Sequence, residues 1–546
     1  MQIFSRNRRI CWLVVAIFVF GIYSVWLGQD CWWDLLNYHL YNPFSFLQGT
    51  WGNFTMAAGA HSFLNPLPDL YYYFFFTVFF EHPFLVAFFA GVPAGIFLWL
   101  VGCISANILA QIEYYKKNRS FLVFLIVLLT ATAVGVSCQI GINSNEILLG
   151  NFVLASFWLL CLFVKDPETQ FKKIGWAAFI CGAATGMKLT VAPFCIALLA
   201  GYLLQWKRLN RPFKGLCIFA LSGLAGFLVT DGYFMWKLYA QYGNPIFPYY
   251  NDIFHSPYFE SIYLTDTRHI PPTWTHYLFY PFYWAFQLSP YAAEEHALFR
   301  DMRLALGYLA VIGLAVQWLR KKGEIPVNPL VKTIIIYTMI SYVLWLFSFP
   351  IIRYAVVLEF LVVLLCFVLF LTISKKISKI IFISFAVVVI YTTSSQKLGH
   401  KNLFKTPTQQ VVSFSPDKPF VEDNSLVLLL HAPTAYLAPL LNKSAVYVGG
   451  VRYTTEELRQ LNEYMAHLFN PFPEEFYKFH FEKQYRDLLQ KHQGPIYAVS
   501  FKVSHGGPVI YERLGIKVDP QLCKDFNTNL NPDWLPSYQI CRAEKI

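Results

Sequence analysis

Long apolar runs separated by short clusters of lysine and arginine constrain the fold of this chain more than any single motif. Hydrophobic residues make up 56% of the 546 residues and charged residues only 14%, whereas soluble globular domains carry about 25% charged residues. A membrane-spanning helix needs roughly 20 apolar residues, so the chain has room for about eleven spans and one domain of ordinary size. The composition predicts a polytopic α-helical membrane protein.

Six short basic clusters set the expected topology. The positive-inside rule places such clusters on the cytoplasmic side, so the spans between them must leave and return in pairs. The first apolar run, 10–27, follows a basic cluster and has no small-residue cleavage site, which is typical of a retained signal anchor. The N-terminus is therefore expected in the cytoplasm. The clusters are Arg6, Arg8 and Arg9; Lys116, Lys117 and Arg119; Lys165, Lys172 and Lys173; Lys207, Arg208, Arg211 and Lys214; Arg320, Lys321, Lys322 and Lys332; and Lys375, Lys376 and Lys379.

Two long segments between the predicted spans, 28–83 and 237–302, are expected to be outer loops. The first contains no lysine or arginine, as expected of an outer loop close to its spans. Within it, 70–80 is an apolar aromatic run that is too short to cross a membrane. We expect this run to form a helix in the outer interface.

The composition changes at about residue 394. Strand-like runs at 426–430, 445–448 and 496–501 alternate with helix-like runs at 456–468 and 474–490. This pattern predicts a small α/β extracytoplasmic domain, 394–546, after a transmembrane domain, 1–393. Cys523 and Cys541 lie in this domain. An oxidising compartment would permit a disulfide between them, although sequence spacing alone does not establish one.

The strongest candidate for chemistry directly follows the first apolar run, where Asp30 and Asp34 precede Tyr38 and His39. On an α-helix, Asp34 and Tyr38 would share one face because they are four residues apart. A carboxylate at this place can deprotonate an acceptor hydroxyl or bind a divalent cation. The alternative is a helix cap, since aspartate favours the start of helices.

Three further charged residues are predicted to lie near the same outer plane. Glu146 ends an outer turn, Lys188 lies between two apolar helices, and Arg353 opens a late span. The two cations can hold a phosphate, or they can simply extend to the interface, and Glu146 can simply complement a helix dipole. Glu359 lies about 9 Å inside the late span. A buried carboxylate needs a partner, and we expect Lys188 or Arg353.

The second outer loop carries the aromatic and amide segment Tyr242-Gly-Asn-Pro-Ile-Phe-Pro-Tyr-Tyr-Asn251, which includes Asn244. Aromatic rings beside amides are common in carbohydrate sites, and they are also common in interfacial loops. Asp231, near the outer end of the preceding span, can join the same cavity. Both interpretations of this loop stay open.

The order of these features resembles the GT-C superfamily of integral-membrane glycosyltransferases. The resemblance rests on Asp34-x-x-x-Tyr38, the aromatic helix after Asn65-Pro-Leu-Pro-Asp-Leu-Tyr-Tyr72, the acidic turn at Glu146, the hairpin at Lys188, and Arg353-Tyr354. Over 1–375 the chain is similar to bacterial relatives of protein mannosyltransferases and lipid A aminoarabinose transferases. The fold implied is a GT-C-like bundle in a bacterial inner (plasma) membrane.

The resemblance implies transfer of a sugar, with inversion, from a polyprenyl-phosphate donor to an envelope glycan such as lipopolysaccharide, or to a lipid or protein acceptor, at the outer face of the membrane. It makes Asp34 the general base or the group that orients the acceptor, Glu146 a ligand of a metal or of the acceptor, and Lys188 and Arg353 the groups that stabilise the leaving phosphate. Asp30 is a further candidate catalytic residue. Leu35 stands where the family pattern has Glu, and Glu146 where Asp is common. A divalent cation, Mg²⁺ or Mn²⁺, held by Glu146 is therefore left open. The residues assigned to substrate binding are Tyr38, His39, Asn65, Asp69, Asp231 and Asn244.

Two other classes remain alternatives: an oligosaccharide polymerase or ligase, and a transporter or flippase for polyprenyl-linked glycans. A transporter predicts inverted hydropathy repeats and charged residues near the middle of the membrane, and the sequence shows no such repeat. It also shows no zinc-type spacing and no Walker or dinucleotide motif. The expected partners are lipid-linked donor, acceptor and membrane lipid, without nucleic acid. The sequence specifies neither the sugar nor the acceptor.

Overall fold

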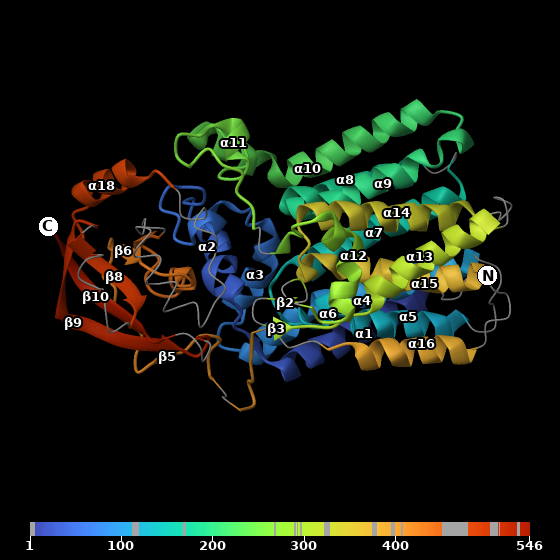
Figure 1. The fold of residues 1–546 in the computed structure, drawn as a ribbon. Coiled ribbons are helices and arrows are strands. Elements are labelled where there is room, and N and C mark those ends of the chain that lie inside the picture. The colour runs from blue at the N-terminus through green and yellow to red at the C-terminus, as the bar shows by residue number, and fades with distance from the viewer. Residues whose placement is uncertain are drawn as a thin grey trace.

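A bundle of long helices occupies one end of the computed structural model, and a six-stranded sheet occupies the other (Figure 1). Short helices of the outer loops lie between these two parts. The structure describes residues 6–111, 119–167, 171–266, 269–288, 291, 293–294, 297–320, 328–373, 379–394, 399–405, 408–449, 479–502, 511–512, 514–531 and 536–546.

Among the described residues, six helices are long and apolar enough to cross a membrane, and five shorter helices accompany them. Each predicted span coincides with one of these helices, which confirms the polytopic helical class. Eleven crossings stay a prediction, because the shorter helices are not long enough to settle it. The six are α1 (Arg6–Leu27), α4 (Pro83–Gln111), α7 (Glu146–Lys165), α10 (Pro212–Tyr242), α14 (Pro329–Ser348) and α15 (Val356–Ile373); the five are α5 (Arg119–Ala131), α8 (Phe171–Met187), α9 (Ala192–Leu203), α13 (Arg303–Arg320) and α16 (Lys379–Thr392).

The apolar run 120–138, between the second basic cluster and the turn before Glu146, is divided into α5 and the short helix α6 (Val134–Ser137). The carboxylate of Glu359 accepts hydrogen bonds from the backbone N–H groups of Gly135 and Val136, at 2.8 and 3.1 Å. The expectation that Lys188 or Arg353 pairs with Glu359 is therefore wrong. The first N–H groups of a helix lack partners within the helix, and a carboxylate at that end satisfies them and complements the helix dipole.

Helices α8 and α10 pack at backbone distance. Gly182 and Gly186 on α8 form a small-xxx-small pattern, which lets membrane helices approach closely. A Cβ atom on Gly182 would lie 2.1 Å from the carbonyl oxygen of Gly223, and one on Gly226 would lie 2.0 Å from that of Phe179. This contact fixes the end of α8, where Lys188 follows.

The aromatic run of the first outer loop forms α3 (Leu70–Val78), a helix of nine residues. At 1.5 Å per residue it is about 14 Å long, which agrees with the prediction that it does not cross the membrane. The outer loops also contain α2 (Tyr41–Leu47), α11 (Asn251–Phe254), α12 (Trp274–Ala285) and the two-residue strands β2 (Ala293–Glu294) and β3 (Ala297–Leu298).

The C-terminal segment forms a mixed sheet with the order β5-β9-β10-β8-β6-β7, in which β6 pairs with β7 and β8 in parallel. The three predicted strands are confirmed as β6 (Leu426–Leu429), β7 (Val446–Val448) and β8 (Ile496–Phe501). The predicted helix 456–468 lies outside the described residues, and the described part of 474–490 contains α18 (Glu482–Lys491). Three strands were not predicted: β5 (Phe414–Ser415), β9 (Ile516–Thr528) and β10 (Tyr538–Lys545).

A short antiparallel ladder joins the first outer loop to the segment after α16. Strand β1 (Gln29–Asp30) pairs with β4 (His400–Lys401). In addition, the side chain of Gln29 donates to the carbonyl oxygen of Val411 at 2.8 Å. The segment that follows α1 is therefore fixed against the C-terminal part of the chain.

Cys523 on β9 and Cys541 on β10 lie opposite each other and form a disulfide, which confirms the candidate pair from the sequence. Closing a loop of this length stabilises a domain by about 3 kcal/mol. We expect the double variant Cys523→Ser/Cys541→Ser to lower the free energy of unfolding of the sheet by about this amount, measured as urea-dependent proteolysis. The control is Cys217→Ser, which removes an exposed free thiol. Equal protease sensitivity of the double variant and this control would contradict the prediction.

Candidate active site

Asp34 and Arg353, which are 319 positions apart in the sequence, form an ion pair in the outer part of the bundle. Nη1 of Arg353 donates to Oδ2 of Asp34 at 2.5 Å. Arg353 lies in the 3₁₀ turn η8 (Ile352–Ala355) that opens α15, and Asp34 lies just before the turn η1 (Leu35–His39). Both side chains are largely buried, at 15% and 11% exposure, so the pair is shielded from solvent.

A second ion pair lies beside the first. Nζ of Lys188 donates to Oε1 of Glu146, the first residue of α7. The same ammonium lies 5.1 Å from the centre of the Tyr354 ring. Because Tyr354 directly follows Arg353, the two cations and the two carboxylates belong to one site. The structure thus brings together four of the charged residues that the sequence singled out.

The turn that carries Asp34 is π-helical over residues 35–39. Its hydrogen bonds run from i to i+5 instead of i+4. The turn is therefore not the α-helix expected from the sequence, although Tyr38 still lies close enough to Asp34 for the two to interact electrostatically. The Tyr38 ring stacks on His61, with centroids 4.9 Å apart, and lies 4.1 Å from the His39 ring.

A buried polar network adjoins the ion pairs. Nδ1 of His39 lies 2.5 Å from Oδ1 of Asp69, and the amide of Asn145 donates to the same oxygen at 2.6 Å. The three side chains have exposures of 1%, 2% and 6%. Asn145 has a left-handed backbone with φ of 69° and directly precedes Glu146. The network therefore connects the first outer loop to the start of α7.

Burial and charge act in opposite directions on Asp34. Burial raises the pKa of its carboxyl, but the Arg353 guanidinium, with smaller contributions from His39 and His61, lowers the pKa to about 2. Asp34 is therefore a carboxylate at neutral pH. Burial raises the pKa of Tyr38 well above its ordinary value and lowers that of His61 to about 4. Both rings are accordingly uncharged at neutral pH.

Asp30 has no part in either ion pair. Its carboxyl accepts hydrogen bonds from the backbone N–H groups of Asn143 at 2.8 Å and Trp32 at 2.9 Å. Burial raises its pKa to about 7, against the lowering effect of these two donors. Asp30 therefore joins the first outer loop to the turn that carries Asn143, Asn145 and Glu146.

The raised pKa of Asp30 has a consequence for stability. The ordinary pKa of this carboxyl, 3.8, applies to the unfolded chain, and the pKa is about 7 in the folded protein, so between these values the folded state binds the additional proton. Stability is then expected to fall as pH rises from about 4 to about 7 and to level off above. Melting temperatures over this range should show a smaller slope for Asp30→Asn than for the wild type. Equal slopes of melting temperature against pH in the two proteins would contradict the raised pKa of Asp30.

Three predicted substrate-binding residues make contacts that fix loops in place. The amide of Asn65 donates to the carbonyl oxygens of Gly186 and Thr230 and to Oδ1 of Asp231, at 3.1, 2.9 and 3.1 Å. Asn65 and Asp231 thus hold the first outer loop on α8 and α10. Asn244 is fully buried, and its amide donates to the carbonyl oxygen of Tyr249 at 3.0 Å, which shapes the second outer loop.

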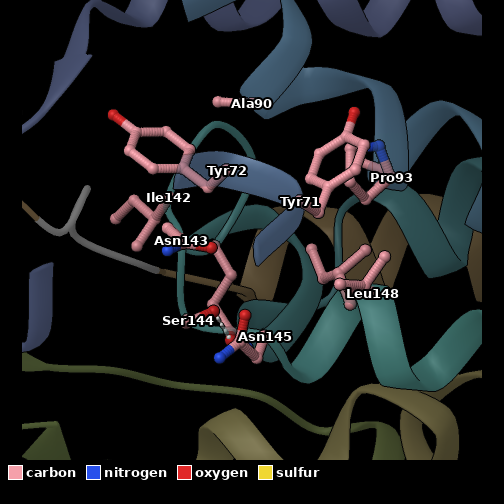
Figure 2. A pocket seen from close by; sticks show the side chains of 12 residues that line it. Tyr71, Tyr72, Ala90, Pro93, Ile142, Asn143, Ser144, Asn145 and Leu148 are labelled. Atoms are coloured by element: carbon pink, nitrogen blue, oxygen red, sulfur yellow. Dashed lines mark hydrogen bonds between the residues drawn. The ribbon is translucent and has the colours of Figure 1, made fainter. Parts of the chain in front are cut away.

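A small cavity lies behind this region, between Tyr71 and Tyr72 of α3 and the turn with Asn143 and Asn145 (Figure 2). Its volume is about 20 Å³, which is enough for a water molecule and too small for a sugar. The cavity is therefore not a substrate site.

The metal suggested for Glu146 does not fit the side chains as they are arranged. Its Oε1 is occupied by Lys188, and the described part of the chain has no group of three His, Cys, Asp or Glu side chains that could hold a metal ion. A hard divalent cation needs several oxygen ligands. No step of the reaction is therefore assigned to a metal ion.

Sequence reasoning assigned no role to three residues of the site, although Tyr354 belongs to a motif that it named. His61 stacks on Tyr38, Tyr354 lies under the Lys188 ammonium, and Asn145 connects Asp69 to α7. Only Asn145 gave a usable signal, because asparagine tolerates the left-handed conformation that often precedes or ends regular structure. The other two depend on contacts between distant segments.

Comparison with solved structures identifies the fold. The chain is similar to ArnT from Cupriavidus metallidurans bound to undecaprenyl phosphate, with 13% sequence identity, a TM-score of 0.50 and 98% of each chain covered. It also matches the apo state of the same protein, at 12% identity, a TM-score of 0.49 and 97% coverage of each chain. No protein-family model and no curated protein sequence matches the chain. The agreement over nearly the whole length shows that this chain has the same overall fold as ArnT.

Proposed function

We propose that this protein is a membrane glycosyltransferase that takes a sugar from a polyprenyl-phosphate donor. The observation that carries the proposal is the pair of cations, Lys188 and Arg353, gathered with Asp34 and Glu146 in one largely buried site. Two cations side by side suit a phosphate group. In the free protein, the two carboxylates balance their charge.

The lipid part of the donor is proposed from the fold. ArnT was solved bound to undecaprenyl phosphate, and a polyprenyl chain reaches a membrane site by lateral diffusion. The proposed location is a bacterial inner membrane, with the N-terminus in the cytoplasm and the C-terminal sheet outside. Transfer would then take place at the outer face, onto an envelope glycan, lipid or protein.

The proposed reaction is a displacement at the anomeric carbon. An acceptor atom attacks this carbon from the face opposite the phosphate, and the bond between the carbon and the phosphate oxygen breaks. The bonding electrons stay on the polyprenyl phosphate, whose growing negative charge is stabilised by Lys188 and Arg353. Attack from the opposite face inverts the configuration of the sugar.

A turnover assay tests the proposal. Purified protein in lipid vesicles is given a sugar-labelled polyprenyl-phosphate donor and an envelope extract, and the release of free polyprenyl phosphate is measured. We expect release that depends on the protein, and a decrease of about 10²–10³-fold for Lys188→Met. The matched control is Lys237→Met. Lys237, in α10, lies over the Trp51 ring and belongs to neither ion pair. Movement of the lipid-linked glycan across the bilayer without release would instead support a flippase.

A further inference from the structure

We propose that His39, oriented by Asp69, accepts the proton of the attacking group, and that this group is therefore a hydroxyl. The inference rests on the proposed glycosyltransferase function and names the catalytic base and the acceptor chemistry of the same site. The resemblance of the sequence pointed instead to Asp34 as the base.

Asp69 fixes the orientation of the His39 imidazole. Asp69, as a carboxylate, can only accept a hydrogen bond, so Nδ1 of His39 must carry the proton of their 2.5 Å contact. The lone pair of the neutral ring is then on Nε2. Asn145 donates a second hydrogen bond to Asp69 at 2.6 Å and holds the carboxylate in place. A carboxylate that fixes the tautomer and orientation of a histidine is a recurring arrangement in proton-transfer sites.

Nε2 of His39 is buried and has no hydrogen-bond partner among the described residues. A polar atom in this position is costly and needs an explanation. The side chain is 1% exposed, and Oε2 of Glu146, one residue after Asn145, is likewise buried and unpartnered within the described structure. Two acceptor atoms of this kind near the two ion pairs are suited to a ligand with hydroxyl donors.

The His39 ring also lies close to the first ion pair. It follows Asp34 in a π-helical turn, and such turns occur frequently at functional sites. Electrostatic interactions link His39 to Asp34, Asp30 and His61. The ring thus lies beside the first cation–carboxylate pair and not in a remote part of the core.

The ion pair also makes Asp34 a poor base. Its carboxylate is held by Arg353 at 2.5 Å, and a group so strongly favoured in its charged form has little tendency to accept a proton. Asp34 is better suited to position Arg353 for the donor phosphate. The His39 imidazole, whose Nε2 has no partner among the described residues, is better suited to accept the proton.

The proton-transfer step balances as follows. The acceptor oxygen forms a bond to the anomeric carbon, while the bond from this carbon to the phosphate oxygen breaks and its electrons leave with the polyprenyl phosphate. The hydroxyl proton moves to Nε2 of His39, which becomes imidazolium next to the Asp69 carboxylate. The proton is later released to solvent. A phosphate acceptor has no such proton to lose at neutral pH, and for this reason we infer a hydroxyl.

The test compares His39→Gln and Asp69→Asn with the wild type in the donor-turnover assay. Both variants are expected to lower kcat by about 10²–10⁴-fold, with binding of undecaprenyl phosphate retained because both keep Lys188 and Arg353. In the wild type kcat should also decrease towards acid pH, since protonated His39 has no lone pair. This decrease should be absent in His39→Gln.

The titratable groups around His39 are Asp69, Tyr38, Asp34, Asp30 and His61. Asp30→Asn is the control for the pH profile. The acid decrease should persist in Asp30→Asn, because Asp30 only holds backbone groups. His82→Gln, at an exposed position after α3, should keep wild-type turnover. If His39→Gln binds undecaprenyl phosphate and retains wild-type kcat or the acid decrease, this inference is wrong. A wild-type protein that releases no polyprenyl phosphate would overturn the proposed function as well.

Discussion

Arg353→Gln is expected to lower kcat/KM for the polyprenyl-phosphate donor by about 10²–10³-fold, because it removes one of the two cations that stabilise the leaving phosphate. It should also destabilise the protein. The carboxylate of Asp34 would remain largely buried without its partner, and breaking a buried ion pair in this way costs about 3–5 kcal/mol. Donor turnover in vesicles and thermal unfolding in detergent measure the two effects.

A double variant separates the two effects. In Asp34→Asn/Arg353→Gln both charges of the pair are gone, so thermal stability should largely return while donor turnover stays low. Arg353→Lys keeps the charge but loses the planar guanidinium, and it should retain intermediate turnover. Wild-type turnover in Arg353→Gln would exclude this residue from the donor site, and a double variant as unstable as the single one would show that the ion pair does not set the stability.

Gly182→Ala is expected to prevent correct packing of α8 on α10. The added Cβ atom would lie 2.1 Å from the carbonyl oxygen of Gly223, and backbone on both sides leaves no side chain that could move away. Overpacking of a core costs about 1–3 kcal/mol where side chains can adjust, and we expect at least the upper end here. The measurements are the yield of monodisperse protein and its melting temperature.

Activity should decrease together with stability in this variant, because Lys188 follows the end of α8 and its position depends on the helix contact. Gly313→Ala provides the control, since a Cβ atom at this position on α13 meets nothing within 4 Å. It should leave both the yield and the melting temperature unchanged. If Gly182→Ala behaves like Gly313→Ala, the close approach of the two helices is not required for folding.

The helices were predictable from the sequence because apolar length and basic clusters are local signals. The same holds for β6, β7 and β8, which are apolar and buried. Strand β9 escaped prediction because it is rich in polar residues and contains Pro520, and most of its side chains are partly or fully exposed. Its place in the sheet depends on pairing with β10 on one side and β5 on the other.

The candidate site was predictable in part, for a similar reason. Asp34, Glu146, Lys188 and Arg353 could be placed near one plane because each lies at the end of an apolar run. Which carboxylate pairs with which cation depends on how the helices pack, and the sequence does not contain that information locally. The partner of Glu359 and the contact between His39 and Asp69, which are 30 positions apart, were beyond sequence reasoning for the same reason.

The ladder between β1 and β4 also bears on how the protein is made. Asp30 lies in the first loop to be translated, and its strand partner, His400, lies beyond the last predicted span. During synthesis the loop with Asp34 and His39 therefore has to wait for most of the chain before its final neighbours exist. A nascent chain that stops before this point carries every charged residue of the two ion pairs but lacks the strand that anchors their loop. Completion of the site with the two ion pairs is thereby coupled to completion of the membrane bundle.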